Sequence, residues 1–475
     1  MNDYFTMQDE FRIEGYWRLP TWAENREVRG SAAYSPRDGI MLTVEGALED
    51  AIKLQGGLVI GGGVPNVSYD TVHGRTLNNE PVTLFEVFGG GLPYIRGLSG
   101  SQRQYPAQWL ILGERVAGLE DWRHTSISAR YHNLEEIVGR LPLSVPINHE
   151  GMSKLSAIFE TPESLKGMLG PFEVSTEHRG LLSIDSPFVR AEISHTAWLR
   201  LIAPSAKGTD LLRGPLHMLG CLLDLAAGHH LPLIALHGRR GAHESQIFFK
   251  QRYASLPPKR IKSVGGHPIG FAFTLGGLGP NLTRHLGCWH EGMTKYSSAF
   301  NMYFALDPDA DSDVAIDFHF LSYVTALESF HAAAHRYCAK CLDVRKQREV
   351  WRGSVMAVLG EIKEPAPVHW VRNILGSSLG PGLKARHEEL YDEQPASVKQ
   401  LLGARTEFID YVQSARNRLA HGERPYESGE ELLRLWRTTR KLRLMMQVML
   451  LKQLELPVPL FDLALTNLSD FRFLH

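Results

Sequence analysis

The chain has 475 residues, of which 43% are hydrophobic and 22% are charged. This length predicts at least two domains, and the ordinary apolar content excludes a largely disordered chain. The formal net charge of -1 excludes attraction of nucleic acid by the charge of the whole chain, so any such binding needs a local basic patch.

The first ten residues are polar and acidic, without the apolar segment of a signal peptide. Apolar runs are too short to span a membrane, and the strongest of them, 442–454, contains Gln447 and Lys452. The four cysteines are too few and too scattered for a disulfide framework. We therefore expect a reduced, cytoplasmic protein that makes no contact with the membrane.

Residues 1–150 are predicted to be rich in β-strands. The segment 40–45 places Ile40, Leu42 and Val44 on one face of a strand. Residues 72–77 and 82–88 resemble two strands joined by a tight turn at 78–80. The glycine triplets at 61–63 and 89–91 lack the lysine and the following helix of a phosphate-binding loop, so we do not expect nucleotide binding there.

Residues 151–305 are predicted to mix strands and helices, and a subdomain boundary is possible near 150. We expect a long strand or strand pair over 189–202, a leucine-rich helix over 210–227, short strands over 232–236 and 246–249, a loop over 276–280 and a helix over 288–304. A group of polar side chains in this region is a possible ligand site, although a solvated loop is the simpler interpretation; it comprises His229, His230, His237, Arg239, Arg240 and His243.

The acidic stretch 307–313, with Pro308, is the predicted domain boundary, which separates residues 1–305 from 311–475. Beyond it we expect four helices, over 316–334, 348–362, 396–415 and 429–454, with a loop-rich connection at 365–381. Asp311 and Ser312 are candidate caps of the first helix. Four such helices suit an antiparallel bundle, so the expected fold class is α+β, with a β-rich region followed by an all-α bundle.

The third of these helices ends in the string Arg416-Asn417-Arg418-Leu419-Ala420-His421, followed by Gly422. Imidazole is the usual proton carrier at neutral pH, and guanidinium presents parallel donors to phosphate. RNA carries its own nucleophile, the 2′-hydroxyl. These residue types therefore predict RNA cleavage without a metal, with Arg416 and His421 as catalytic residues and Asn417 holding phosphate or orienting the histidine.

Helical geometry complicates this interpretation. Five residues separate the two side chains by roughly 140° on an unbroken helix. Gly422 predicts that the helix ends here, in a left-handed cap. Each chain supplies one histidine of the string, whereas the reaction needs a base and an acid, so we expect a two-fold homodimer that brings both strings together. The alternative is that Arg416 and His421 only cap a helix.

Three other groups lie in the helical region. Arg434, Arg437, Arg440 and Lys441 recur at three- and four-residue steps on the last helix. Of these, Arg434, Arg437 and Lys441 form the basic stripe that is the candidate RNA contact, and the alternative is a solvated face. His331 and His335 are four residues apart but have no evident third ligand, so core or groove histidines are the better interpretation than a metal site. We expect neither zinc nor redox function from Cys338-x-x-Cys341, and thus no metal or cofactor.

Several segments resemble a known family. Phe11 to Pro20, Val28 to Gly30, Ile40 to Val44, His73-Gly74 and Val82 to Leu84 are similar to the opening of ApeA N-terminal domains. Residues 311–455 resemble an ApeA-like HEPN domain, with Ala326 to His331 similar to its first helix. The resemblance implies an antiphage protein that acts by abortive infection, with the HEPN domain as the ribonuclease. Carried over by residue, it implies Arg416, Asn417 and His421 as the site.

The expected function is thus a metal-independent endoribonuclease of antiphage defence, with RNA as substrate and a phage-derived trigger as a possible partner of the N-terminal region. Glu328 is a candidate supporting residue that positions His421, or else an ordinary surface or cap carboxylate. Two alternatives remain open. One is a non-catalytic HEPN module that binds nucleotide or a partner protein, and the other is an N-terminal carbohydrate or peptide binder whose HEPN part only dimerises.

Overall fold

The computed structural model describes residues 5–475 except 24, 49–67, 90–101, 141–142, 145–157, 186–189, 252–262, 265–266, 269, 307–314, 336–338 and 360–381. The chain forms two compact units. One comprises Met1–Asp224, His230–Ile269 and Thr274–Leu286, and the other comprises Leu225–His229, Gly270–Phe273 and Gly287–His475. The glycine triplet 61–63, most of 89–91, and the acidic stretch 307–313 with its candidate caps lie outside the described residues, so the boundary expected there stays a prediction.

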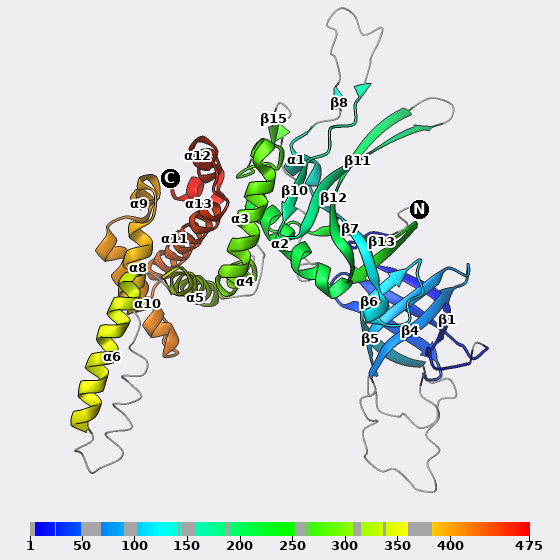
Figure 1. The fold of residues 1–475 in the computed structure, drawn as a ribbon, viewed down its shortest axis with the longest axis horizontal. Helices are drawn as coiled ribbons and strands as arrows, with labels where there is room; N and C mark the ends of the chain where they lie inside the picture. Colours follow the sequence, from blue (N-terminus) through cyan, green and yellow to red (C-terminus); the bar gives the residue numbers. More distant parts are fainter. Residues whose placement is uncertain are drawn as a thin grey trace, which may run out of the picture. The chain divides into compact units, whose positions relative to one another are not determined.

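Antiparallel strands at the start of the first unit close into a barrel (Figure 1). In spatial order they are β6, β3, β2, β1, β4 and β5, and β5 pairs again with β6. Their bounds are β1 Phe11–Arg18, β2 Val28–Ser35, β3 Gly39–Glu45, β4 Ser68–Thr76, β5 Pro81–Phe88 and β6 Gln102–Leu112. The strand expected over 40–45 and the hairpin expected over 72–88 are confirmed as β3 and the β4–β5 pair.

Packing inside the barrel explains one of its glycines. Trp17 on β1 is fully buried. Its ring lies so close to β4 that a Cβ atom added at Gly74 would stand 2.5 Å from ring carbons. Because real side chains do not approach so closely, only glycine fits at this position, and the barrel interior is filled by side chains rather than by solvent.

The sheet continues from the barrel through β6 into β14, β13, β7, β12, β11 and β10. The bounds are β7 Arg123–Tyr131, β10 Lys166–Leu169, β11 Phe172–Asp185, β12 Arg190–Gly208, β13 Leu233–Arg240 and β14 His243–Phe249. Two small pairs stand apart, β8 Leu143–Ser144 with β9 Ile158–Phe159, and β15 Ser263–Val264 with β16 His267–Pro268. The long strand and the two short strands expected from the sequence are confirmed as β12, β13 and β14.

One long helix, α2 Thr209–Ala227, and three short ones accompany the sheet. The short ones are η1 Leu119–Asp121, α1 Leu134–Val138 and η2 Gly276–Asn281. The leucine-rich helix expected over 210–227 is confirmed as α2. The loop expected over 276–280 is wrong, because these residues form η2. Two local hydrogen bonds stabilise the start of η2, from Gly277 N–H to Thr274 Oγ1 (3.1 Å) and from Leu278 N–H to Leu275 O (3.2 Å). The segment was predicted as a loop because it is rich in glycine and contains a proline.

From Leu282 onward the described residues form helices and their connections, so a β-rich region is followed by an all-α region, as expected. The bounds are α3 Leu282–Lys295, α4 Ser297–Phe304, α5 Ile316–His335, α6 Ala339–Leu359, α8 Leu383–Asp392, α9 Ala396–Leu402, α10 Arg405–Ala420, α11 Gly429–Gln453, α12 Val458–Asn467 and α13 Ser469–Leu474. The single helix expected over 288–304 is instead two, α3 and α4, separated at Tyr296, whose backbone leaves the helical region.

The third helix of the expected bundle is also two helices. Gly403, with φ of +88°, ends α9, and α10 begins at Arg405. A left-handed residue cannot continue an α-helix, so the chain turns here although the apolar pattern runs on. The sequence also gave no sign of α8, α12 and α13. The first, second and last helices of the expected bundle are confirmed as α5, α6 and α11. The connection expected at 365–381 lies outside the described residues.

Helix α11 forms the centre of the helical unit. Every side chain from Leu442 to Leu451 is buried, so the apolar run noticed in the sequence belongs to a core. No helix among the described residues is both long enough and apolar enough to cross a membrane. Arg440 and Arg443 on α11 reach the fully buried Asp470 of α13, at 2.7 and 3.2 Å. This ion cluster fixes the last helix against α11.

Candidate functional site

Arg416 and Glu328 meet where α10 packs against α5. Arg416 Nε lies 3.9 Å from Glu328 Oε1, and the two side chains are 38% and 20% exposed. The buried side of α10, formed by Phe408, Val412 and Ala415, sets the rotation of the helix. Arg416 is therefore held beside Glu328 by one edge of its guanidinium group, while part of the group stays open to solvent.

The environment of Glu328 is unusual for a carboxylate. Burial raises the pKa of its side chain above the ordinary value of 4.5, and the positive charges of Arg416 and Arg386 oppose this shift. A desolvated carboxylate binds a neighbouring guanidinium more strongly than an exposed one does. Glu328 is thus suited to hold Arg416 in place. No hydrogen bond or ion pair joins it to His421 in the described part of the chain, and its expected role in positioning that histidine stays a prediction.

His421 stands at the C-terminal end of α10. Its backbone N–H donates to the carbonyl oxygens of Asn417 and Arg418, both at 3.1 Å. Gly422 has φ of +77°, so the left-handed cap expected from the sequence is confirmed. The N–H groups of Gly422 and Glu423 donate to Leu419 O and Arg418 O, the pattern of a Schellman motif. The cap fixes the backbone of His421 and leaves its side chain exposed.

The predicted catalytic residues do not form one cluster within a single chain. Arg416 turns toward α5, whereas Asn417 and His421 are exposed. The guanidinium group of Arg418 forms ion pairs with the carboxylates of Glu423 and Glu427, at 4.0 and 3.8 Å. Since α10 stays helical up to Ala420, the separation of roughly 140° between positions 416 and 421 is preserved. One chain therefore offers a guanidinium beside Glu328 and an exposed imidazole at a different angle around α10.

The basic stripe lines a cavity of about 490 Å³ between α11 and the α9–α10 junction. Arg434 packs over the ring of Tyr411, 4.3 Å from its centre, and pairs with Glu407 at 3.3 Å. Arg437 is exposed at the rim. The three stripe residues thus line one hollow together with Tyr411, which the sequence did not single out.

Lys441 differs from the two arginines of the stripe. Its Nζ donates to the carbonyl oxygen of Leu402 at 2.8 Å. Burial lowers the pKa of the ammonium group; Glu407 opposes this shift, and Arg437 and Arg434 add to it. Part of the role of Lys441 is therefore to satisfy the end of α9, next to Gly403.

A second strip of polar side chains joins α5 to α8. His331 Nε2 lies 2.7 Å from Glu389 Oε2, and His335 Nε2 lies 3.5 Å from Glu393 Oε1. Sequence reasoning found the two histidines but missed the carboxylates, which lie 58 residues away in the chain. The available signal was the same four-residue step in Glu389 and Glu393, which matches that of the histidines.

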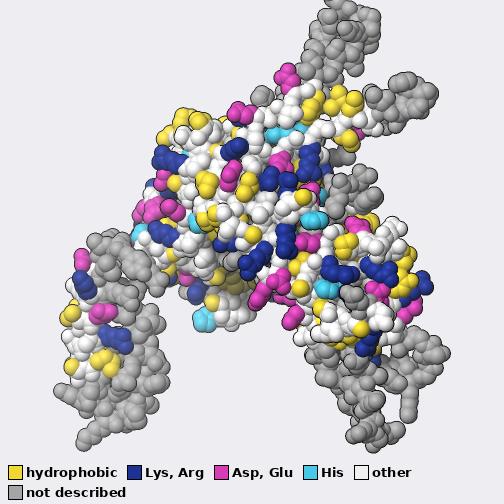
Figure 2. Space-filling view, turned by 45° about the vertical axis from the view of Figure 1, so that its right-hand side comes forward, with side chains coloured by type: hydrophobic (Ala, Val, Ile, Leu, Met, Phe, Trp, Pro, Cys, Tyr) yellow, Lys and Arg dark blue, Asp and Glu magenta, His cyan; other side chains and the backbone are white. Residues whose placement is uncertain are grey.

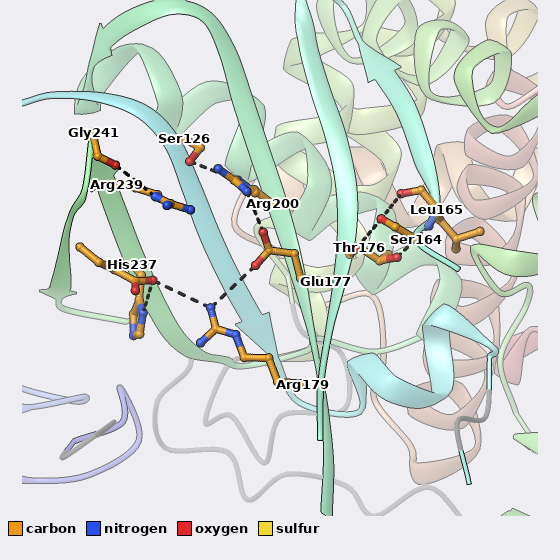
Figure 3. Close-up of polar contacts among 11 residues, drawn as sticks. Ser126, Ser164, Leu165, Thr176, Glu177, Arg179, Arg200, His237, Arg239 and Gly241 are labelled. Carbon is orange, nitrogen blue, oxygen red and sulfur yellow. Dashed lines mark hydrogen bonds and ion pairs between the residues drawn. The ribbon is translucent and has the colours of Figure 1, made fainter. Parts of the chain in front are cut away.

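Figure 3 shows a third polar group, on the sheet of the first unit. Arg200 of β12 joins Ser126 of β7 to Glu177 of β11, at 3.3 and 2.9 Å. Arg179 lies 3.7 Å from Glu177 and 3.9 Å from Glu244, which accepts from His237 Nδ1 at 3.1 Å. The expectation of a solvated loop is wrong for His237, because it is 2% exposed within β13.

The pairing of opposite charges on this sheet gives a cross-linked surface rather than a patch of one sign. On the face shown in Figure 2, basic and acidic side chains likewise lie next to one another. This agrees with the formal net charge of -1. Attraction of a polyanion must then come from a local group such as the stripe on α11.

Two family models match the chain. The model of ApeA N-terminal domain 1 matches residues 12–289, which is more than half of the chain. The model described as Apea-like HEPN matches residues 321–458, which include Glu328, Arg416 and His421. No curated protein and no solved structure matches the chain significantly.

Proposed function

The chain belongs to the ApeA family, with an Apea-like HEPN domain, and on that premise we propose that it is an effector of antiphage defence that cleaves RNA. The observation that carries the proposal is the pairing of Arg416 with the partly buried Glu328 inside the HEPN match, five residues before the exposed His421. These groups can act on a phosphodiester without a catalytic metal.

In the proposed reaction the 2′-oxygen of RNA attacks the adjacent phosphorus and the bond from phosphorus to the 5′-oxygen breaks. One imidazole removes the 2′-proton, and a second group protonates the leaving oxygen. The guanidinium of Arg416, held by Glu328, donates to the phosphate oxygens as negative charge grows on them. Asn417 lies on the exposed side near His421 and is proposed to bind the same phosphate.

A homodimer would supply the second imidazole. His421 is exposed, and in one chain it lies far around the helix from Arg416, so a partner surface is needed to complete the site. We propose that two HEPN domains pair about a two-fold axis, with each string facing the other. Cleavage of RNA essential to the host would then halt growth of the infected cell, which is the proposed route to abortive infection.

The test is cleavage of RNA by the purified chain without added Mg²⁺. We expect products that end in a 2′,3′-cyclic phosphate, because the 2′-hydroxyl is the nucleophile. His421→Ala should lower the rate about 10²–10⁴-fold, as the loss of a general acid or base does. His475→Ala, at an exposed histidine of the same unit, is the matched control and should cleave as the parent does. Products with 3′-hydroxyl ends, or an unchanged rate for His421→Ala, would contradict the proposal.

The cavity beside the stripe favours a second candidate function, in which a non-catalytic HEPN module binds a nucleotide. Arg434, Arg437 and Tyr411 offer two cations and an aromatic ring around a hollow of about 490 Å³, a combination that suits a phosphate and a base. In that case Arg437→Gln would weaken nucleotide binding, while no RNA would be cleaved by any form of the chain.

A further inference from the structure

The contact between α5 and α8 carries matched polar side chains on both helices. On α5 these side chains are Glu328, His331 and His335. On α8 and its C-cap, the residues with the same spacing are Arg386, Glu389 and Glu393. Positions i, i+3 and i+7 lie on one face of a helix, so the two sets can meet side by side. They do so at His331 with Glu389 and at His335 with Glu393.

We propose that His331, His335 and Glu389 bind one zinc ion. One ligand atom from each residue lies within 4.8 Å of the others. Zinc takes imidazole nitrogen and carboxylate oxygen at about 2.0–2.2 Å, which places neighbouring ligand atoms roughly 3.3 Å apart in a tetrahedron. Small rotations of the side chains would therefore bring all three onto a single ion. Two histidines four residues apart on one helix turn are a recurrent arrangement for such a pair of ligands.

The arrangement of the two imidazoles supports a shared ligand more than a simple ion pair. The rings of His331 and His335 are stacked, with centres 4.2 Å apart and planes 25° from parallel. Their Nε2 atoms both face carboxylates of the α8 segment. Both imidazoles and the carboxylate of Glu389 can therefore reach one cation. Glu393 is placed either to complete the tetrahedron or to orient His335.

Burial also favours a metal with a structural role. The side chain of His331 is 1% exposed, whereas those of His335 and Glu389 are 25% and 36% exposed. The site is therefore buried on the His331 side and open to solvent on the other side, from which an ion can enter. The ion would tie α5 to α8 one turn away from Glu328. None of the three ligands is a residue of the proposed RNA-cleavage site, so the zinc proposal does not depend on that function.

The test measures binding of Zn²⁺ by the full chain without an affinity tag. After dialysis against chelator and then against buffer with Zn²⁺, we expect about one zinc per chain by elemental analysis. His335→Ala and Glu389→Gln should each weaken zinc binding by about 100-fold or more, beyond the 10–100-fold typical for loss of an outer partner. Both positions are partly exposed, so these variants should fold, which circular dichroism can check. His290→Ala, at a partly exposed histidine of α3, is the matched control and should bind as the parent does.

Zinc should also raise the melting temperature of the parent chain and of His290→Ala, but not that of the two ligand variants. Co²⁺ offers a further readout, because thiolate ligands give a charge-transfer band that imidazole and carboxylate ligands lack. A double Cys338→Ser, Cys341→Ser variant should keep its zinc. The proposal is overturned if the parent binds no zinc, if His335→Ala and Glu389→Gln bind it as tightly as the parent, or if the cysteine variant alone loses it.

Discussion

Burial disfavours the charged form of Glu328, whereas the nearby Arg416 and Arg386 favour it. Its folded-state pKa lies above the ordinary value of 4.5, chiefly because of burial. Between the unfolded and the folded pKa, the folded chain therefore binds more protons at Glu328 than the unfolded chain does. The contribution of Glu328 to stability is greatest below the unfolded pKa and is lost as the pH rises through the folded pKa.

Replacement of Glu328 by Gln tests this directly. Because Gln does not ionise, the melting temperature of Glu328→Gln relative to the parent should rise as the pH is raised from about 4 to about 7. Glu423→Gln is the control for loss of a carboxylate, since Glu423 is 68% exposed and lies 4.0 Å from Arg418. A difference in melting temperature that is constant with pH, or that falls, would show that Arg416 outweighs burial at Glu328.

At this scale the sequence predicted residue types better than it predicted partners. Arg416 and His421 were identified as candidate site residues because their chemistry and spacing are visible along a single helix. Gly422 likewise predicted the left-handed cap at the end of that helix. The neighbours Glu389 and Arg386 come from α8, and Tyr411 of α10 meets Arg434 of α11. No pattern along one helix shows which residues of another helix it will contact. Such partners depend on how helices pack, which a single sequence does not specify.

Among the elements, α11 combines two roles on different faces. Arg440 and Arg443 serve the core through Asp470, whereas Arg434, Arg437 and Lys441 line the cavity near α10. The three- and four-residue steps in the sequence did not separate these roles. The C-terminal half of α11 is buried, whereas Arg434 and Arg437 are exposed to solvent near α10. We therefore propose that these arginines bind the phosphate backbone of RNA beside α10.

The stripe predicts a difference between binding and chemistry. Changing Arg434, Arg437 and Lys441 together to Gln should weaken RNA binding and reduce the slope of log K against log salt by about 2 for single-stranded RNA, since three phosphate contacts are lost. Arg416→Gln should instead lower the cleavage rate with little change in that slope. Binding and rate are measured separately over a salt series.

Lys346→Gln on α6 is the matched control for loss of an exposed cation and should leave binding near the parental value. Melting temperatures must accompany the triple variant, because Lys441 also caps α9 through Leu402. A triple variant that melts as the parent does and binds RNA with the parental salt slope would make the stripe a solvated face.

The elements themselves were predicted unevenly, for physical reasons. Strands such as β3 and the β4–β5 hairpin follow from alternation and turn residues, which are local. The break between α9 and α10 depends on a single left-handed glycine, Gly403, inside a continuous apolar pattern. Helix α8 has short, mixed apolar spacing and is defined by its contacts with α5 and α10.

At the scale of the whole molecule, the order of the two regions was predictable and the closure of the barrel was not. Closure requires β5 to pair with β6 as well as with β4. Such pairing joins segments separated by residues 90–101, and nothing in the alternation of either strand specifies it. A change from alternating to helical periodicity, by contrast, marks the transition to an all-α region in any sequence.

The assembly of two chains is the last prediction. One chain holds Arg416 beside Glu328 and exposes His421 on a different side of α10, so the proposed site needs a second copy. Sedimentation should show at least a dimer.

A mixed dimer of one parental chain and one His421→Ala chain, isolated through two different tags, then distinguishes independent sites from a shared site. Independent sites would leave about half of the parental rate per dimer, whereas a shared site that takes its base from one chain and its acid from the other should lose about 10²–10⁴-fold. A mixed dimer built with His475→Ala controls for the tags and for exchange of chains, and it should keep the full rate. Half activity in the His421 mixed dimer would refute the shared site while leaving the chemistry of each chain intact.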